Sequence, residues 1–67
     1  MKALGVDIGT GSISLAVVDE EKLIYQDYRL HRGEISLTLK EMLDILLKEG
    51  KEDIDYVAVS PMAAAFF

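Results

Sequence analysis

The feature that most constrains this chain is a run of four small residues, Gly-Thr-Gly-Ser at 9–12, between two apolar segments. Residues 3–8 are apolar and rich in β-branched side chains, which predicts a central strand. Residues 12–18 alternate small or polar with large apolar residues, which predicts a strand with one buried face. The connection is too short for a crossover, so the two strands must be antiparallel.

A third strand is predicted at 23–30, after the polar turn at 19–22. It completes an antiparallel meander, and its mixed polarity indicates a more exposed position. Tyr25 and Tyr28 fall on opposite faces of this strand, so they do not form a stacking platform for bases.

The hydrophobic period changes to that of a helix at about Ser36, and the spacing predicts a helix over 37–49. Ser36 or Thr38 can cap its start, and Thr38 with Glu41 has the spacing of a capping box. Gly50 stands where a C-terminal cap glycine belongs. We expect the apolar stripe to face the core and to bind nothing; it consists of Ile35, Leu39, Met42, Leu43, Leu46 and Leu47.

The apolar run at 54–60 predicts a buried strand that follows the helix and pairs in parallel with the first strand. Asp53 and Asp55 mark a polar entrance to it, and Pro61 ends it. The predicted order is therefore β-β-β-α-β, an α/β arrangement.

The chain has 67 residues, and we treat residues 1–67 as a partial N-terminal nucleotide-binding subdomain. A chain of this size buries only about 60% of its unfolded surface. The apolar segment 62–67 follows the last strand, and we expect Phe66 and Phe67 to begin the buried face of a further helix. We therefore expect the chain to be the first part of a larger domain.

The net charge is −5 and the pI is about 4.6, which argues against partners such as nucleic acid or an anionic membrane. Arg29, His31 and Arg32 form one small basic spot, which we expect to be a solvated loop. The chain has no cysteine, so it holds no disulfide or thiolate metal site. Asp7 interrupts the apolar start, so no signal peptide is predicted and the expected location is cytoplasmic.

The small residues at 9–12 have the chemistry of a phosphate-binding loop. Gly9 and Gly11 allow positive φ and close approach of a ligand to the backbone, and successive N–H groups in such a turn bind anions. The hydroxyls of Thr10 and Ser12 add donors. Asp7 would repel phosphate unless a cation lay between them, and Mg²⁺ is held by few carboxylates together with phosphates. The pattern therefore predicts a Mg²⁺–nucleotide site.

The plainer alternative is a tight hairpin with an acidic residue at the end of its first strand. Neither a P-loop nor a dinucleotide fingerprint is present, because no Gly-Lys-Ser/Thr follows and no helix begins after the loop.

The segment GVDIGTGSISLAVVDEEKLI resembles the first phosphate motif of the superfamily of acetate kinases, sugar kinases, heat-shock ATPases and actins. The β-β-β-α-β order resembles the start of its ribonuclease H-like fold. Within that superfamily the chain most resembles the BadF/BadG/BcrA/BcrD ATPases, which include the activators of 2-hydroxyacyl-CoA dehydratases. The segment DIDYVAVS contributes to this resemblance, which covers residues 1 to 60.

The resemblance implies that Asp7 holds Mg²⁺ and that Gly9, Thr10, Gly11 and Ser12 contact the β- and γ-phosphates of ATP. The longer activators also carry a [4Fe–4S] cluster between two subunits, which implies a dehydratase or a second copy of the chain as partner. Two departures stand out. The chain lacks the cysteines for a cluster, and Ser60-Pro61-Met62-Ala63 replaces a Thr-Gly-Tyr-Gly-like loop.

Three alternatives remain open at this point. A carbohydrate kinase of the FGGY type shares the first loop and has a fourth strand that ends near a serine, as at Ser60. A type III pantothenate kinase fits less well, because its loop usually carries Gly-Asn-Thr. A structural module without nucleotide is the third. Under any of these, catalysis by this chain alone is not expected, because phosphoryl transfer needs groups on both sides of the phosphates.

Overall fold

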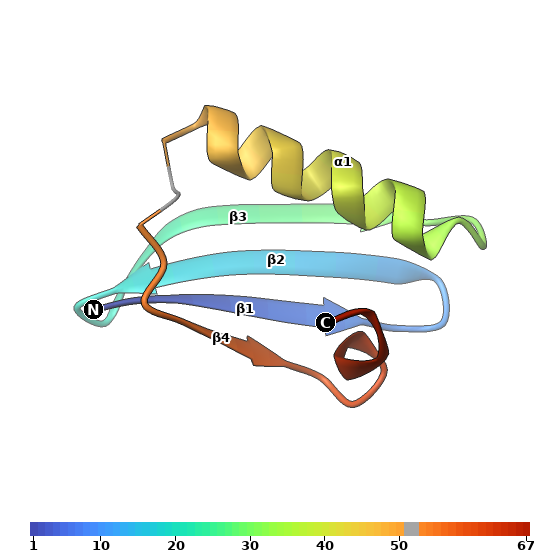
Figure 1. Ribbon diagram of the computed structural model, residues 1–67, viewed down its shortest axis with the longest axis horizontal. Helices are drawn as coiled ribbons and strands as arrows, with labels where there is room; N and C mark the ends of the chain where they lie inside the picture. The colour runs from blue at the N-terminus through green and yellow to red at the C-terminus, as the bar shows by residue number, and fades with distance from the viewer. Residues whose placement is uncertain (51–52) are drawn as a thin grey trace.

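The computed structural model describes residues 1–50 and 53–67 and forms one mixed four-stranded sheet with a helix on one face (Figure 1). The first three strands are β1 (Lys2–Ile8), β2 (Ser12–Asp19) and β3 (Lys22–Leu30), and each pairs antiparallel with the next. Strand β4 (Tyr56–Val59) pairs in parallel with β1. The order across the sheet is β3-β2-β1-β4, so β1 is central, as predicted.

The helix α1 (Ile35–Lys48) begins two residues before the predicted start. Thr38 is not a cap, because its N–H donates to the Glu34 carbonyl at 3.0 Å within the helix, and Glu34 occupies the N-cap without a side-chain cap bond. The expected capping box is therefore wrong, and Ser36 is not the cap either, because it lies inside the helix. Gly50 does follow the helix with φ of +77°, and its N–H donates to the Leu47 carbonyl.

The core lies between the sheet and α1, where alternate residues of β1 and β2 meet three residues of the helix. Leu47 belongs to the predicted apolar stripe but is 55% exposed, because it lies at the edge of the helix face that contacts the sheet. The buried apolar residues are Leu4, Val6, Ile8, Ile13, Leu15, Val17, Leu39, Met42, Leu46 and Ala63.

The prediction that β4 is buried is wrong. All four of its residues are exposed, and Val57 is 46% exposed although it lies beside the buried Leu4. Strand β4 forms one edge of the sheet, and α1 lies over the strands near the opposite edge (Figure 1). A short 3-10 helix (Ala63–Phe66) follows it; only its Ala63 is buried, while Phe66 and Phe67 are exposed.

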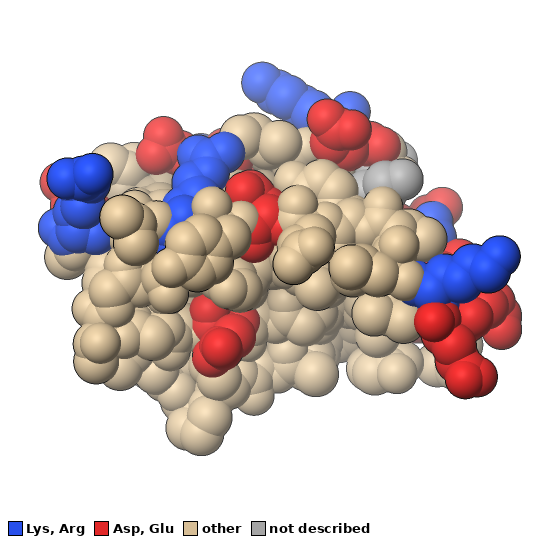
Figure 2. Space-filling model, turned by 180° about the vertical axis from the view of Figure 1, so that it is seen from behind, with Lys and Arg blue, Asp and Glu red and all other residues tan. Residues whose placement is uncertain are grey.

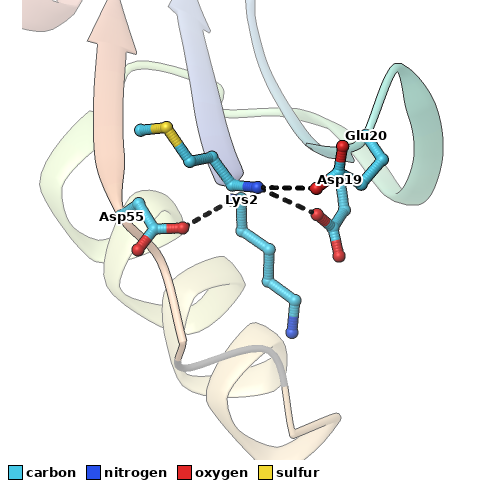
Figure 3. A network of polar contacts seen from close by, with 5 residues as sticks. Lys2, Asp19, Glu20 and Asp55 are labelled. Carbon is cyan, nitrogen blue, oxygen red and sulfur yellow. Dashed lines mark hydrogen bonds and ion pairs between the residues drawn. The ribbon is translucent and has the colours of Figure 1, made fainter.

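The first two residues of the chain make polar contacts with Asp19, Glu20 and Asp55 at the end of the sheet opposite the glycine loop (Figure 3). The Met1 amino group lies 3.3 Å from Glu20 Oε1 and 3.5 Å from Asp19 Oδ1, and its pKa is raised mainly by the hydrogen bond to Glu20. The carboxylate of Asp55 accepts a 2.7 Å hydrogen bond from the Lys2 amide. This contact supports the expectation that Asp55 belongs to the strand entrance.

Figure 2 shows the molecule from behind. Lys and Arg side chains lie along the top and the two sides of this view, and a broad surface without them lies below. No helix among the described residues has the length and apolar character needed to cross a membrane.

Candidate functional site

The predicted phosphate-loop residues lie together at the carboxyl end of β1, where the chain turns into β2. Gly9 N–H donates to the Ser12 carbonyl at 2.8 Å, which leaves Thr10 and Gly11 as the tip. Both tip residues are exposed. Within residues 1–50 and 53–67, no protein acceptor is found for the N–H of Thr10 or of Gly11. The tip therefore presents two backbone donors that a ligand can use.

The β1–β2 loop differs from the other hairpin of the sheet. The β2–β3 turn has Glu20 and Glu21 at φ of 50° and 65°, the left-handed pair of a tight type I′ hairpin. Gly9, Thr10 and Gly11 all lie outside the positive-φ region. The expectation that the loop glycines serve a positive φ is therefore wrong, and the β1–β2 loop is not a hairpin of the same type.

Gly11 has a different structural significance. A Cβ built at this position would meet no atom of the described residues within 4 Å. Because neither backbone conformation nor crowding within the chain requires glycine there, the absent side chain leaves the backbone open to an outside group. This is the arrangement that close approach of a phosphate needs.

The carboxylate of Asp7 lies on the face of the sheet opposite α1. Its neighbours Val6 and Ile8 point into the core, and Asp7 pairs with Ser14 across the β1–β2 ladder. Asp7 and Ser14 line one part of a shallow groove of about 380 Å³ on this open face. The floor of the groove is made of small residues, among them Gly5, Ala16 and Ala58.

Ser60 joins the end of β4 to the end of β1 just before the loop. Its N–H donates to the Val6 carbonyl at 2.9 Å, and its Oγ accepts the Ile8 N–H at 3.1 Å and the Ala63 N–H at 3.3 Å. The hydroxyl thus continues the β1–β4 pairing by one step where the chain turns away at Pro61. The sequence pointed to Ser60 only through its place at a strand end.

His31 was missed as part of the site. It was expected in a solvated loop with Arg29 and Arg32, but it is only 4% exposed. Its ring nitrogen Nε2 lies 3.0 Å from the Gly9 carbonyl oxygen, so it packs directly against the glycine loop. The misjudged basic spot therefore consists of a half-buried Arg29, an exposed Arg32 and a buried histidine.

The groups available for a metal are few. Among the described residues no cluster of three or more His, Cys, Asp or Glu side chains could hold an ion. Asp7 is the acidic residue next to the loop, and a single carboxylate suits Mg²⁺ only when phosphates and water supply the other ligands. The donor set thus fits a metal that arrives with a polyphosphate rather than one held by the protein alone.

Comparison with known proteins gives one informative match. No protein-family model matches the sequence, and no curated protein matches it significantly. A solved structure from Listeria monocytogenes, the "Lmo2764 protein, a putative N-acetylmannosamine kinase", superposes with a TM-score of 0.66 and 27% identity. The match covers 90% of this chain and 21% of the Listeria chain.

The chain therefore spans about a fifth of the length of the structure it matches. The likeness extends over 90% of this chain, so it is not confined to a single element. It supports the superfamily of actin-like ATPases and kinases, and it gives no support to the BadF/BadG/BcrA/BcrD group in particular. The chain has the fold of an N-terminal piece of a kinase-like domain.

Proposed function

We propose that this chain is the phosphate-binding N-terminal part of an ATP-dependent sugar kinase. In this proposal the Gly9–Ser12 loop binds the β- and γ-phosphates of ATP, and Asp7 takes part in holding Mg²⁺. The observation that carries it is the loop tip, where the N–H groups of Thr10 and Gly11 have no acceptor in the described part of the chain and where Gly11 is open to solvent. The likeness to the Listeria kinase supports the same assignment.

The roles divide by chemistry. The N–H groups of Thr10 and Gly11 would donate to phosphate oxygens, and the hydroxyls of Thr10 and Ser12 would add further donors. Bound Mg²⁺ would neutralise the charge of the phosphates. Asp7 would orient the water or metal ligand beside the loop, because its carboxylate lies on the open face within the groove.

A sugar kinase is favoured over a dehydratase activator because the matching structure carries a sugar-kinase title. Phosphoryl transfer also needs groups on both sides of the phosphates. Because the chain corresponds to 21% of the Listeria protein, we propose binding rather than turnover for these 67 residues by themselves.

The test is a titration of ¹⁵N-labelled chain with Mg·ATP, followed through the amide signals of Gly9, Thr10 and Gly11. We expect selective shifts at these three amides. Asp7→Asn should weaken the binding of Mg·ATP and have little effect on ATP in the presence of a chelator, since the carboxylate acts through the metal. Asp53→Asn removes the same charge at the other end of the sheet and serves as the matched control.

Absence of any shift at the loop amides at millimolar Mg·ATP would overturn the proposal and leave a structural module. Equal weakening by Asp7→Asn and Asp53→Asn would show a general charge effect and would remove Asp7 from the site.

A further inference from the structure

His31 is the chain's single histidine, and it connects two turns that are far apart in sequence. It follows β3 directly and is buried between the β1–β2 loop and the start of α1. Its backbone N–H donates to the Gly11 carbonyl at 3.1 Å, and its carbonyl accepts the Glu34 N–H at 2.8 Å. Its ring contacts Gly9 on one side and Gly33 on the other.

The two ring contacts determine the protonation state of the imidazole. The Gly33 N–H lies 3.0 Å from Nδ1 and can only donate, so Nδ1 must carry the lone pair. The Gly9 carbonyl lies 3.0 Å from Nε2 and can only accept, so Nε2 must carry the hydrogen. Both contacts are therefore satisfied only by the neutral ring with its hydrogen on Nε2.

The contact with Gly9 changes how the glycine loop closes. In a two-residue hairpin the first carbonyl accepts an N–H from the residue after the tip, which is Ser12. In the described part of the chain, the Gly9 carbonyl bonds to His31 Nε2, and no bond from the Ser12 N–H to this carbonyl is present. The histidine thus replaces the bond that would close an ordinary hairpin.

The planarity of the peptide bond carries this effect to the loop tip. The Gly9 carbonyl and the Thr10 N–H belong to one trans peptide unit, so they point in opposite directions. When the carbonyl is held toward the His31 ring, the Thr10 N–H must point away from the ring. The Thr10 N–H is one of the two loop donors for which the described residues provide no acceptor.

We propose that His31 is a positioning residue for the phosphate-binding loop: its neutral ring, protonated at Nε2, holds the Gly9 carbonyl so that the Thr10 N–H faces a bound polyphosphate. The polyphosphate in this statement rests on the proposed function. The tautomer and the control of loop geometry rest only on contacts within the chain.

The first arm of the experiment uses the free chain. Long-range ¹H–¹⁵N correlations of the histidine ring should show a protonated Nε2 and an unprotonated Nδ1. A ring protonated at Nδ1, or one that averages between tautomers as in solvent, would overturn the inference. This measurement needs no variant and no nucleotide.

The second arm compares His31→Phe, which keeps a planar ring without polar atoms, with His31→Gln, whose side-chain amide can still donate to Gly9. In the free chain, His31→Phe should displace the amide signals of Thr10 and Gly11, and His31→Gln should restore them toward the wild-type positions. Unchanged signals in His31→Phe would overturn the inference. If His31→Phe does not fold, the inference is tested by the ring tautomer in the wild-type chain and by the Thr10 and Gly11 amide signals of His31→Gln.

The third arm measures the dissociation constant for Mg·ATP. Loss of an oriented donor should weaken binding by about tenfold in His31→Phe, and His31→Gln should recover most of it. If wild-type chain binds Mg·ATP and His31→Phe binds it equally well, the positioning role is overturned. If wild-type chain does not bind Mg·ATP, the proposed function fails, while the first two arms still decide the role of His31 in the loop.

Discussion

Met42 shows how little spare stability a chain of this size has. Its side chain is fully buried between α1 and the sheet. Truncation of a buried methionine to alanine costs about 2–5 kcal/mol, because contacts are lost and a cavity is left. The whole chain is expected to have roughly 3–10 kcal/mol of stability at this length. We therefore expect Met42→Ala to be largely unfolded, or to unfold at much lower urea, by circular dichroism. The control is Leu47→Ala, at an exposed position of the same helix. An equal loss of stability in the two variants would contradict the burial of Met42 against the sheet.

Tyr25 links a single residue to the pH dependence of stability. Its pKa is raised from the ordinary value of 10.0, first by burial and then by the charge of Asp27. The folded state therefore keeps the phenol proton to higher pH than the unfolded state does. The resulting stabilisation is complete below about pH 10 and is lost as the pH rises through the folded pKa. Urea unfolding should show wild type losing stability relative to Tyr25→Phe above about pH 10.

The neighbour of Tyr25 supplies the control for this pH experiment. Asp27 has one carboxylate oxygen, Oδ2, that is buried and has no hydrogen-bond partner among residues 1–50 and 53–67, and its other oxygen lies 3.8 Å from Arg29 Nε. Because Asp27 contributes to the raised pKa of Tyr25, Asp27→Asn should reduce the alkaline loss of stability. If the difference in the free energy of unfolding between wild type and Tyr25→Phe does not change with pH, the raised pKa of Tyr25 does not contribute to the alkaline loss of stability.

At the level of elements, the β2–β3 hairpin carries a strain that a substitution can remove. Glu20 and Glu21 both have positive φ, which residues with a Cβ adopt at a cost of about 1 kcal/mol or more each. Glycine at the second position suits a type I′ turn. We expect Glu21→Gly to raise the free energy of unfolding by about 1 kcal/mol, measured by urea denaturation. Glu41→Gly, in the middle of α1, should have the opposite sign, and a loss of stability in Glu21→Gly would argue against this turn.

The same hairpin contains a β-bulge that decides what lies beside the glycine loop. The register shifts between Val17 and Val18, so that Val18 faces Leu23 and Val17 faces Tyr25. Ile24 is the extra residue. Without this shift Leu30, rather than His31, would lie opposite Gly11. The bulge also places Tyr25 on the core face and Tyr28 on the open face, which agrees with the predicted separation of the two tyrosines.

For the whole molecule, net charge is the property that most clearly predicts a measurable response. The chain has a formal charge of −5, and its ion pairs lie mainly at exposed or partly exposed side chains. Such pairs contribute little, whereas repulsion among the excess acids opposes the folded state. We expect the thermal midpoint to rise between low and physiological NaCl, where the Debye length falls to about 8 Å. Glu41→Gln, which reduces the excess negative charge at an exposed site, should show a smaller rise in the thermal midpoint. A midpoint that falls with added salt would contradict the claim that repulsion among acidic side chains outweighs the ion pairs.

The sequence by itself determined the strand and helix order and the place of the turns. The alternation at 12–18, the helical period after Ser36 and the short connection at 9–12 leave little choice, because each pattern buries apolar side chains in only one kind of element. The candidate phosphate loop with Asp7 was also proposed from the sequence alone, because glycine and hydroxyl side chains next to a carboxylate form a local chemical pattern. These are properties of neighbouring residues.

The tertiary structure decided which side chains the loop contacts and which strands are covered. His31 lies beside Gly9 only because one bulge shifts the β2–β3 register, and Ser60 reaches Ile8 only because β4 pairs in parallel with β1. The exposure of β4 depends on where α1 lies across the sheet, since an apolar run looks the same whether a layer covers it or not. Local patterns cannot carry this information, because register and layer contacts are settled between residues that are distant in sequence.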